Sequence, residues 1–153
     1  MHRHGYRGRK FGRKTDQRRA LMRGLMCSLI EYQTITTTLS RCKETRRELE
    51  KLITIARKGG LSNRRIVISR LNDLESANLL VDVIAPQIKR DSGYLRIERA
   101  GFRRGDNAEM GTISFVDEID FEAGVTNDAK TAAKKSEVKS EKAKAKTAKK
   151  EDK

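Results

Sequence analysis

Apolar residues recur at helical spacing near the N-terminus and predict a first helix over residues 16–32. Its apolar face consists of Leu21, Met22, Leu25, Met26, Leu29 and Ile30. Thr15 or Asp16 is the expected N-cap. Residues 35–38 follow as an Ile-Thr-Thr-Thr run, entirely β-branched and too short for a helix, which predicts a strand.

A second helix is predicted from an N-cap at Ser40 to Lys58, ending at the glycine pair 59–60. Its core face is Cys42, Leu49, Leu52, Ile53 and Ala56. At about 100° per residue, the opposite side gathers a ridge of Lys43, Arg47, Lys51, Thr54 and Lys58, with Glu44, Glu48 and Glu50 at its margins. A solvated charged face usually explains such a helix. The single sign of charge on the ridge favours a surface that contacts phosphates.

Residues 63–71 fit a strand or a helix, because Ile66-Val67-Ile68 has no decisive period. We favour a helix, since Ser62 is a good N-cap and Asp73 can cap the helix that follows. That fourth helix is expected to break at Pro86. Its apolar face would comprise Leu74, Ala77, Leu80, Val81 and Ile84.

Alternation predicts two strands in the last third of the globular region. Residues 94–102 place Leu95 and Ile97 inward, after a turn at 91–93. A loop at 105–107 leads to a returning strand over 112–116, with Ile113 and Phe115 inward. The order α-β-α-α-α-β-β predicts an α+β domain over residues 15–121, with helices packed on a small three-stranded sheet.

Charge is distributed unevenly along the 153 residues, whose net charge is +14. Residues 1–23 hold nine basic residues and one acidic residue, whereas residues 24–121 hold 16 basic and 14 acidic residues. Residues 122–153 are rich in Lys, Ala and Glu, and are predicted to be a disordered tail. The chain therefore divides into a basic arm (1–14), a globular domain (15–121) and a tail (122–153).

The arm has too little apolar surface to order itself, and it is expected to order only against a polyanion. Its glycines allow close backbone approach, its arginines can grip phosphates, and its rings can stack on unpaired bases. A solvated basic tail without a specific partner is the alternative. The RNA-binding candidates of this region are Arg3, His4, Tyr6, Arg7, Arg9, Lys10, Phe11, Arg13, Lys14, Arg18, Arg19 and Arg23.

The sequence also argues against membrane insertion, zinc binding, a phosphate-binding loop and catalysis. No apolar run is long enough for a transmembrane helix or a signal peptide, so a cytoplasmic location is expected. Cys27 and Cys42 are interpreted as reduced, buried residues, and combining them with His2 and His4 does not make a credible zinc set. Gly12-Arg13-Lys14-Thr15 lacks the order of a phosphate-binding loop. No His or second acidic cluster accompanies the three helix glutamates, so an enzyme is not expected.

Several collinear motifs carry a resemblance to a known family. The chain resembles the seventeenth protein family of the bacterial large ribosomal subunit over about residues 1–118. The motifs are Gly8-Arg9-Lys10-Phe11-Gly12-Arg13, Arg18-Arg19-Ala20-Leu21-Met22-Arg23, Ile35-Thr36-Thr37-Thr38-Leu39, Glu50-Lys51-Leu52-Ile53-Thr54, Asn63-Arg64-Arg65, Gly93-Tyr94-Leu95-Arg96-Ile97 and Arg104-Gly105-Asp106-Asn107-Ala108-Glu109-Met110. Gln17 and Glu109 depart from the His and Pro that are frequent in the family.

The resemblance implies a two-layer α/β fold and a structural component of the large subunit, bound to its ribosomal RNA toward the polypeptide-exit side. Its expected partners are large-subunit ribosomal RNA and neighbouring large-subunit proteins, with no cofactor, metal, membrane or small-molecule substrate. Further RNA-binding candidates are Lys43, Arg47, Lys51, Arg64 and Arg65. The alternative is a free DNA-binding or nucleoid-associated protein that uses the third and fourth helices. Their connection at Asn72-Asp73 has no glycine, however, which disfavours a helix-turn-helix.

Overall fold

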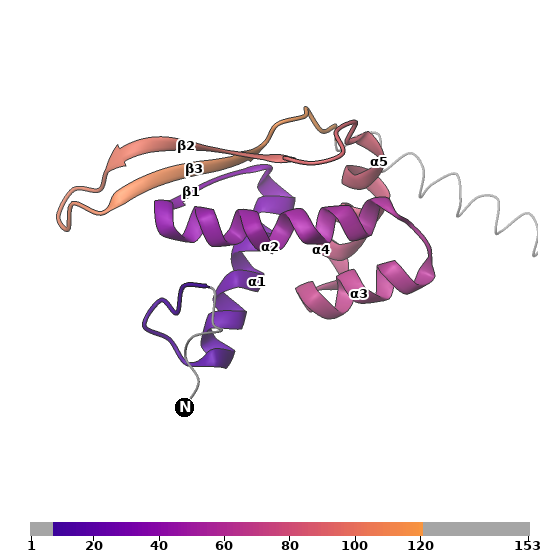
Figure 1. Ribbon diagram of the computed structural model, residues 1–153, viewed down its shortest axis with the longest axis horizontal. Coiled ribbons are helices and arrows are strands. Elements are labelled where there is room, and N and C mark those ends of the chain that lie inside the picture. Colours follow the sequence, from indigo (N-terminus) through magenta and orange to yellow (C-terminus); the bar gives the residue numbers. More distant parts are fainter. Residues whose placement is uncertain (1–7, 121–153) are drawn as a thin grey trace, which may run out of the picture. The chain divides into compact units, whose positions relative to one another are not determined.

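A computed structural model describes residues 8–120, and the predictions for residues 1–7 and 121–153 lie outside this range. The predicted α+β class and the order of the elements are confirmed (Figure 1). In chain order the elements are α1 (Thr15–Tyr32), β1 (Thr34–Thr38), α2 (Leu39–Arg57), α3 (Leu61–Leu71), α4 (Leu74–Asn78), the π-helical turn η1 (Leu79–Ile84), α5 (Ala85–Gln87), β2 (Leu95–Phe102) and β3 (Glu109–Phe115).

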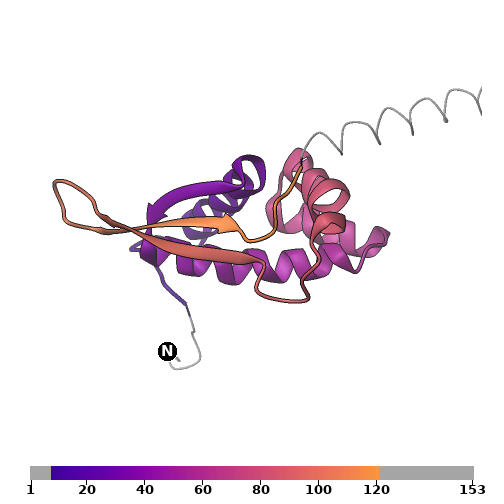
Figure 2. The same ribbon diagram turned by 90° about the horizontal axis from the view of Figure 1, so that it is seen from above.

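The three strands form one antiparallel sheet in the order β1-β3-β2. Ile113 of the central strand lies opposite Ile35 on one side and Ile97 on the other. The pairing of β1 with β3 ends at Thr38 and Met110, whereas β2 and β3 stay paired as far as Phe102 and Glu109. The β2–β3 hairpin therefore continues beyond the three-stranded sheet, with a bulge between Arg99 and Gly101 (Figure 2).

The sheet packs on the first half of α2 at a close approach centred on Gly111. A Cβ added to Gly111 would lie 3.2 Å from Leu39 Cδ1 and 3.4 Å from Cys42 Sγ. Cys42 is buried, and its thiol donates a hydrogen bond to the Gly111 carbonyl oxygen at 3.3 Å. The absence of a side chain at residue 111 thus lets helix and sheet touch, and Leu49 and Ile53 extend the same core along α2.

The fourth helix ends at Gln87, one residue after the predicted break at Pro86, but its middle is not a regular α-helix. The backbone widens into η1, where the Ala85 N–H bonds to the Leu80 carbonyl oxygen five residues back. This wider turn accommodates proline, which lacks an N–H and crowds the preceding turn of an α-helix. The predicted apolar face is also partly wrong, since Leu74 is 59% exposed and Val81 is half-buried, whereas Ala77, Leu80 and Ile84 are buried.

Predicted N-caps are confirmed at one helix and wrong at three. Asp73 caps α4, because its Oδ2 accepts a hydrogen bond from the Ser76 N–H at 3.0 Å. The N-cap of α1 is Lys14 rather than Thr15 or Asp16. The chain passes directly from β1 into α2, so Thr38 occupies the N-cap in place of Ser40. Gly60, with a φ of 84°, precedes α3 and places Ser62 inside its first turn.

Candidate nucleic-acid interface

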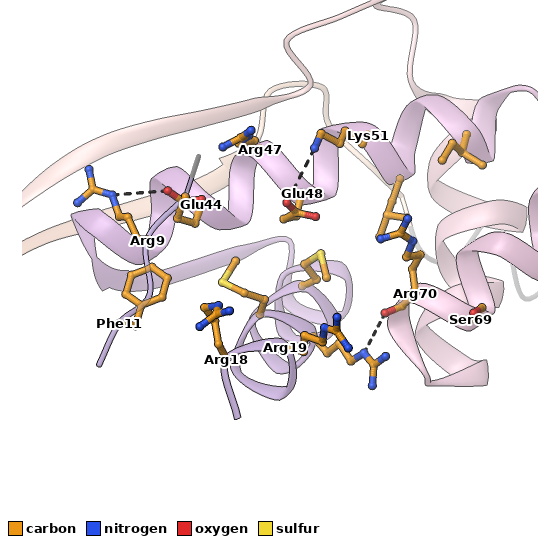
Figure 3. A pocket seen from close by; sticks show the side chains of 16 residues that line it. Arg9, Phe11, Arg18, Arg19, Glu44, Arg47, Glu48, Lys51, Ser69 and Arg70 are labelled. Atoms are coloured by element: carbon orange, nitrogen blue, oxygen red, sulfur yellow. Dashed lines mark hydrogen bonds and ion pairs between the residues drawn. The ribbon is translucent and has the colours of Figure 1, made fainter. Parts of the chain in front are cut away.

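Basic residues from four separate segments line one groove, which we call the α1–α2 groove (Figure 3). It has a volume of roughly 620 Å³ and lies between the described part of the arm, α1, α2 and the end of α3. The lining residues are Gly8, Arg9, Phe11, Arg18, Arg19, Met22, Arg23, Met26, Glu44, Arg47, Glu48, Lys51, Leu52, Ile55, Ser69 and Arg70.

The α1 wall follows from the amphipathic pattern of that helix. Leu29 and Ile30 are fully buried and fix α1 on the core. The arginines at 18, 19 and 23 flank the apolar stripe, so this packing brings them to the groove. Arg23 also joins two elements, because its Nε donates a hydrogen bond to the Arg70 carbonyl oxygen of α3 at 3.2 Å. The end of α3 is thereby held beside α1.

The α2 wall presents Arg47 and Lys51, which are one helical turn apart. Glu44 and Glu48 also line the groove, whereas the sequence placed them only at the margin of the basic ridge. Both carboxylates have basic partners: Arg9 Nε lies 3.6 Å from Glu44 Oε1, and Lys51 Nζ lies 3.9 Å from Glu48 Oε1. The lysine and arginine of these pairs are exposed, so the pairs are weak and the two basic groups can exchange the carboxylates for phosphate oxygens.

The described part of the arm already contacts the body of the protein. Arg9 donates a hydrogen bond from Nη1 to Ser40 Oγ at 2.9 Å, in addition to its ion pair with Glu44. Phe11 is half-buried and has a φ of 55°, and its carbonyl oxygen accepts a bond from Arg13 Nη1 at 2.9 Å. Arg18 Nη1 in turn donates to the Arg13 carbonyl oxygen at 3.2 Å. These contacts place Phe11 at the edge of the groove.

The groove combines positive charge with an apolar floor. Seven basic and two acidic residues line it, and Met22, Met26, Leu52 and Ile55 supply the apolar surface. Guanidinium groups can bind phosphate oxygens in pairs, and an aromatic ring or an arginine plane can stack on a base. This arrangement can bind a folded polyanion whose backbone enters the groove.

Of the 13 predicted RNA-binding residues that lie within residues 8–120, seven line the groove and six do not. The seven are Arg9, Phe11, Arg18, Arg19, Arg23, Arg47 and Lys51. Arg3, His4, Tyr6 and Arg7 lie outside the described residues. Lys10, Arg13, Lys14 and Lys43 are exposed but do not line it.

Arg64 and Arg65 of α3 were predicted to bind RNA, but neither lines the groove. Arg64 forms an ion pair with Asp82 of η1, and its Nη1 lies 3.3 Å from Asn78 Oδ1. This arginine therefore connects α3 to the following helical segment. Arg65 lies in a separate shallow hollow on α3, together with the exposed Leu61 and Ile66.

The basic ridge predicted on α2 is also divided by the fold. Only Arg47 and Lys51 of that ridge line the groove. Thr54 Oγ1 lies 3.4 Å from Tyr94 Oη, which places it beside the residue preceding β2. A helical wheel gives the direction of each side chain, but the neighbouring element depends on tertiary packing.

The sequence did not identify Arg70 as a groove residue. Arg70 lies in the last turn of α3 and reaches the groove only because α3 packs beside α1. The methionines at 22 and 26 were assigned to the core, yet they also form part of the groove floor. No local pattern distinguishes these positions from an ordinary helix end or core face.

The two thiols differ from the prediction in one respect. Cys42 is buried as expected, but Cys27 is only half-buried. Burial raises the pKa of both thiols, so neither is activated as a nucleophile. Within residues 8–120, no group of three or more His, Cys, Asp or Glu residues could hold a metal ion. In the same range, no helix is long and apolar enough to cross a membrane.

The helix-turn-helix alternative fits poorly with the third and fourth helices. A recognition helix must present a free face to a DNA groove. Here α4 spans only Leu74–Asn78 before η1 begins, and Arg64 of α3 is paired with Asp82. The α3–α4 corner is thus a short connection whose second α-helix spans only five residues.

Fold and groove together define a class of protein: a small basic α+β protein whose surface is suited to a folded polyanion. Within that class, the family model described as "Ribosomal protein L17" matches residues 21–116. The chain belongs to the ribosomal protein L17 family.

Curated relatives agree with this family. "Large ribosomal subunit protein bL17" of Rhodopseudomonas palustris strain BisB5 is 47% identical over 116 residues, which cover 75% of this chain and 85% of the relative. The protein of the same name from strain TIE-1 is 46% identical over 115 residues, covering 74% and 83%. That of Mesorhizobium japonicum is 45% identical over 116 residues, covering 75% and 81%.

Proposed function

We propose that this chain binds large-subunit ribosomal RNA through the α1–α2 groove and the basic arm of residues 1–14. As a member of the L17 family it is a structural, non-enzymatic component of the large ribosomal subunit in the cytoplasm. The proposal adds the partner molecule and the surface that binds it. Neighbouring large-subunit proteins are the other expected partners.

The convergence of seven basic residues in one groove carries the proposal. They come from the arm, α1, α2 and α3, and only the fold brings together residues as far apart in the sequence as Arg9 and Arg70. Scattered charges that served solubility alone would not require such convergence. A groove walled by arginines fits an RNA backbone, because RNA is recognised largely through its shape and its phosphates.

The groove is tested by a triple variant, Arg19→Gln, Arg47→Gln and Lys51→Gln, in the full-length chain. Glutamine keeps much of each side-chain stem and removes the charge. Affinity for large-subunit ribosomal RNA is measured between low and moderate salt. Because each lost phosphate contact lowers the slope of log affinity against log salt by about 0.7 to 0.9, the slope should fall by about two to three units.

The matched control removes three positive charges outside the groove: Lys89→Gln, Arg90→Gln and Arg96→Gln. None of these residues lines the groove. The control should retain the wild-type slope to within about one unit, because net charge alone has little effect on specific phosphate contacts. Equal losses in the two triple variants would contradict the proposal, since the groove would then contribute only general charge.

A further inference from the structure

The β2–β3 hairpin forms a second exposed surface, at the end of the sheet beyond β1. Past the pair of Thr38 and Met110, the two strands continue, and no third strand of residues 8–120 lies beside them. Figures 1 and 2 both show this extension reaching past the start of α2. We call residues 99–109 the hairpin tip. Residues 99–107 are all exposed, so the hairpin tip contributes almost nothing to the core.

Local bonds hold the hairpin tip in one shape. Arg103 donates to Asp106 through Nε and Nη2, at 3.0 and 2.6 Å. The backbone N–H of Arg103 bonds to the Ala108 carbonyl oxygen at 2.9 Å, and the N–H of Asn107 bonds to the Arg103 carbonyl oxygen at 3.0 Å. The Ala108 N–H also donates to Asp106 Oδ1 at 3.3 Å. An isolated two-stranded hairpin is marginal in water, so this network preorganises an otherwise weak element.

Phe102, the last residue of β2, has a side chain that the fold does not use. It is 69% exposed, although burying an aromatic ring is among the most favourable packing contributions available to a small protein. Its neighbours at 101 and 103–107 are all exposed, and most of them are polar or glycine. Phe102 is thus the one large apolar side chain that is exposed within the hairpin tip.

The arginines of the hairpin tip differ in their partners. Arg99 lies 3.4 Å from Glu109, and Arg103 is bound to Asp106. Arg104 is exposed and has no carboxylate partner within residues 8–120. The hairpin tip thus presents a guanidinium group without a carboxylate partner, two positions along the sequence from the exposed ring of Phe102.

We propose that the hairpin tip is a separate RNA contact, in which Phe102 stacks on an unpaired base and Arg104 binds a neighbouring phosphate. A ring and a guanidinium group at this spacing suit single-stranded RNA, whose bases can leave the helix and stack on aromatic side chains. At a protein-binding site, by contrast, an aromatic ring is expected to lie inside a larger apolar patch that is surrounded by a rim of less important contacts. The inference rests on the proposed function, because it takes the same ribosomal RNA as the partner.

The test compares full-length variants bound to large-subunit ribosomal RNA, using nucleotide-resolution chemical probing and affinity measurements. Phe102→Ala is matched by Tyr32→Ala, since Tyr32 is 71% exposed at the end of α1 and outside both the groove and the hairpin tip. Arg104→Gln is matched by Arg96→Gln, which removes an exposed guanidinium group of β2 that lies outside both the groove and the hairpin tip.

Phe102→Ala should remove the protection of one or a few unpaired bases and leave the remaining protections in place. Its affinity should fall by roughly 5- to 150-fold, the usual effect of losing one base–aromatic stack. Arg104→Gln should weaken binding and lower the salt slope by about one unit. Tyr32→Ala and Arg96→Gln should match the wild-type protein in both measurements.

Two results would overturn this inference. If Phe102→Ala keeps every protection and the wild-type affinity, the ring does not contact RNA. If the Phe102→Ala variant keeps the protections and the affinity but is depleted from assembled large subunits, the hairpin tip contacts a protein. Both results leave RNA binding through the groove intact. Absence of RNA binding by the wild-type chain would instead refute the proposed function itself.

Discussion

The α1–α2 groove and the hairpin tip are both basic surfaces, but they are built in opposite ways. The groove draws its charges from four segments between residues 8 and 70, and it exists only when α1, α2 and α3 pack together. The hairpin tip is contained in residues 99–109 and is shaped by bonds among close neighbours. A surface made by tertiary packing depends on the core, whereas a surface made locally depends on a few hydrogen bonds.

The arm should contribute the largest share of affinity on the groove side. Deleting residues 2–14 removes six basic residues. If all six contact phosphates, the slope of log affinity against log salt should fall by about four to five units. Affinity for large-subunit ribosomal RNA is measured across a salt series, and far-UV circular dichroism establishes that the truncated domain folds. An unchanged slope would show that the arm makes no phosphate contacts with the RNA.

A substitution in the core beneath the groove should lower the free energy of unfolding much more than a substitution in the hairpin tip. Leu49 in α2 is fully buried, so Leu49→Ala should lower the free energy of unfolding by about 2–5 kcal/mol and loosen the groove. Phe102→Ala should change it by less than about 0.5 kcal/mol, because the ring is exposed. Urea unfolding of the full-length chains measures both. Similar losses for the two variants would mean that the hairpin tip is coupled to the core.

The smallest effect concerns the acid titration of the hairpin tip. The bonds from Arg103 and from the Ala108 N–H lower the pKa of Asp106 from 3.8 to about 2. Because the pKa is lowered in the folded state, the stabilisation is present above about pH 4 and is lost as the pH falls toward 2.

A carboxyl NMR titration of the wild-type chain should give an Asp106 pKa of about 2. Arg103→Gln should raise this pKa toward 3.8, because it removes the largest cause of the shift. The pKa of Asp73, which is lowered by hydrogen bonds from Ser76, should not change. An Asp106 pKa that stays low in the variant would show that the backbone N–H alone produces the shift.

Much of the fold could be predicted from residue periodicity. The core face of α2 was predicted correctly, because Cys42, Leu49, Leu52, Ile53 and Ala56 repeat at helical spacing and all are buried. The end of the fourth helix near Pro86 was predicted to within one residue, because proline does not continue a helix. The π-helical turn η1 before it could not be predicted, since no local pattern marks a hydrogen bond that spans five residues.

The candidate site was predictable only in part. Basic residues of α1 and α2 could be selected by composition, but their meeting in one groove depends on how the two helices pack. Arg64 was selected from the motif Asn63-Arg64-Arg65, and the fold pairs it with Asp82 instead. Arg70 was missed because it reaches the groove through the packing of α3. Sequence patterns indicate which residues are charged and exposed, whereas packing decides which of them share a surface.

The central claim, that the groove is the main RNA-binding face, is tested most directly by lysine acylation of the unmodified full-length chain. Lys51 lines the groove with its side chain 61% exposed, and Lys89 is exposed elsewhere on the protein. Acylation of each lysine is measured by mass spectrometry, with the protein free and bound to large-subunit ribosomal RNA. We predict that bound RNA slows acylation of Lys51 by at least about tenfold and leaves Lys89 within about twofold of its free rate, since phosphate contact buries the amine. Equal protection of the two lysines, or stronger protection of Lys89, would contradict the claim.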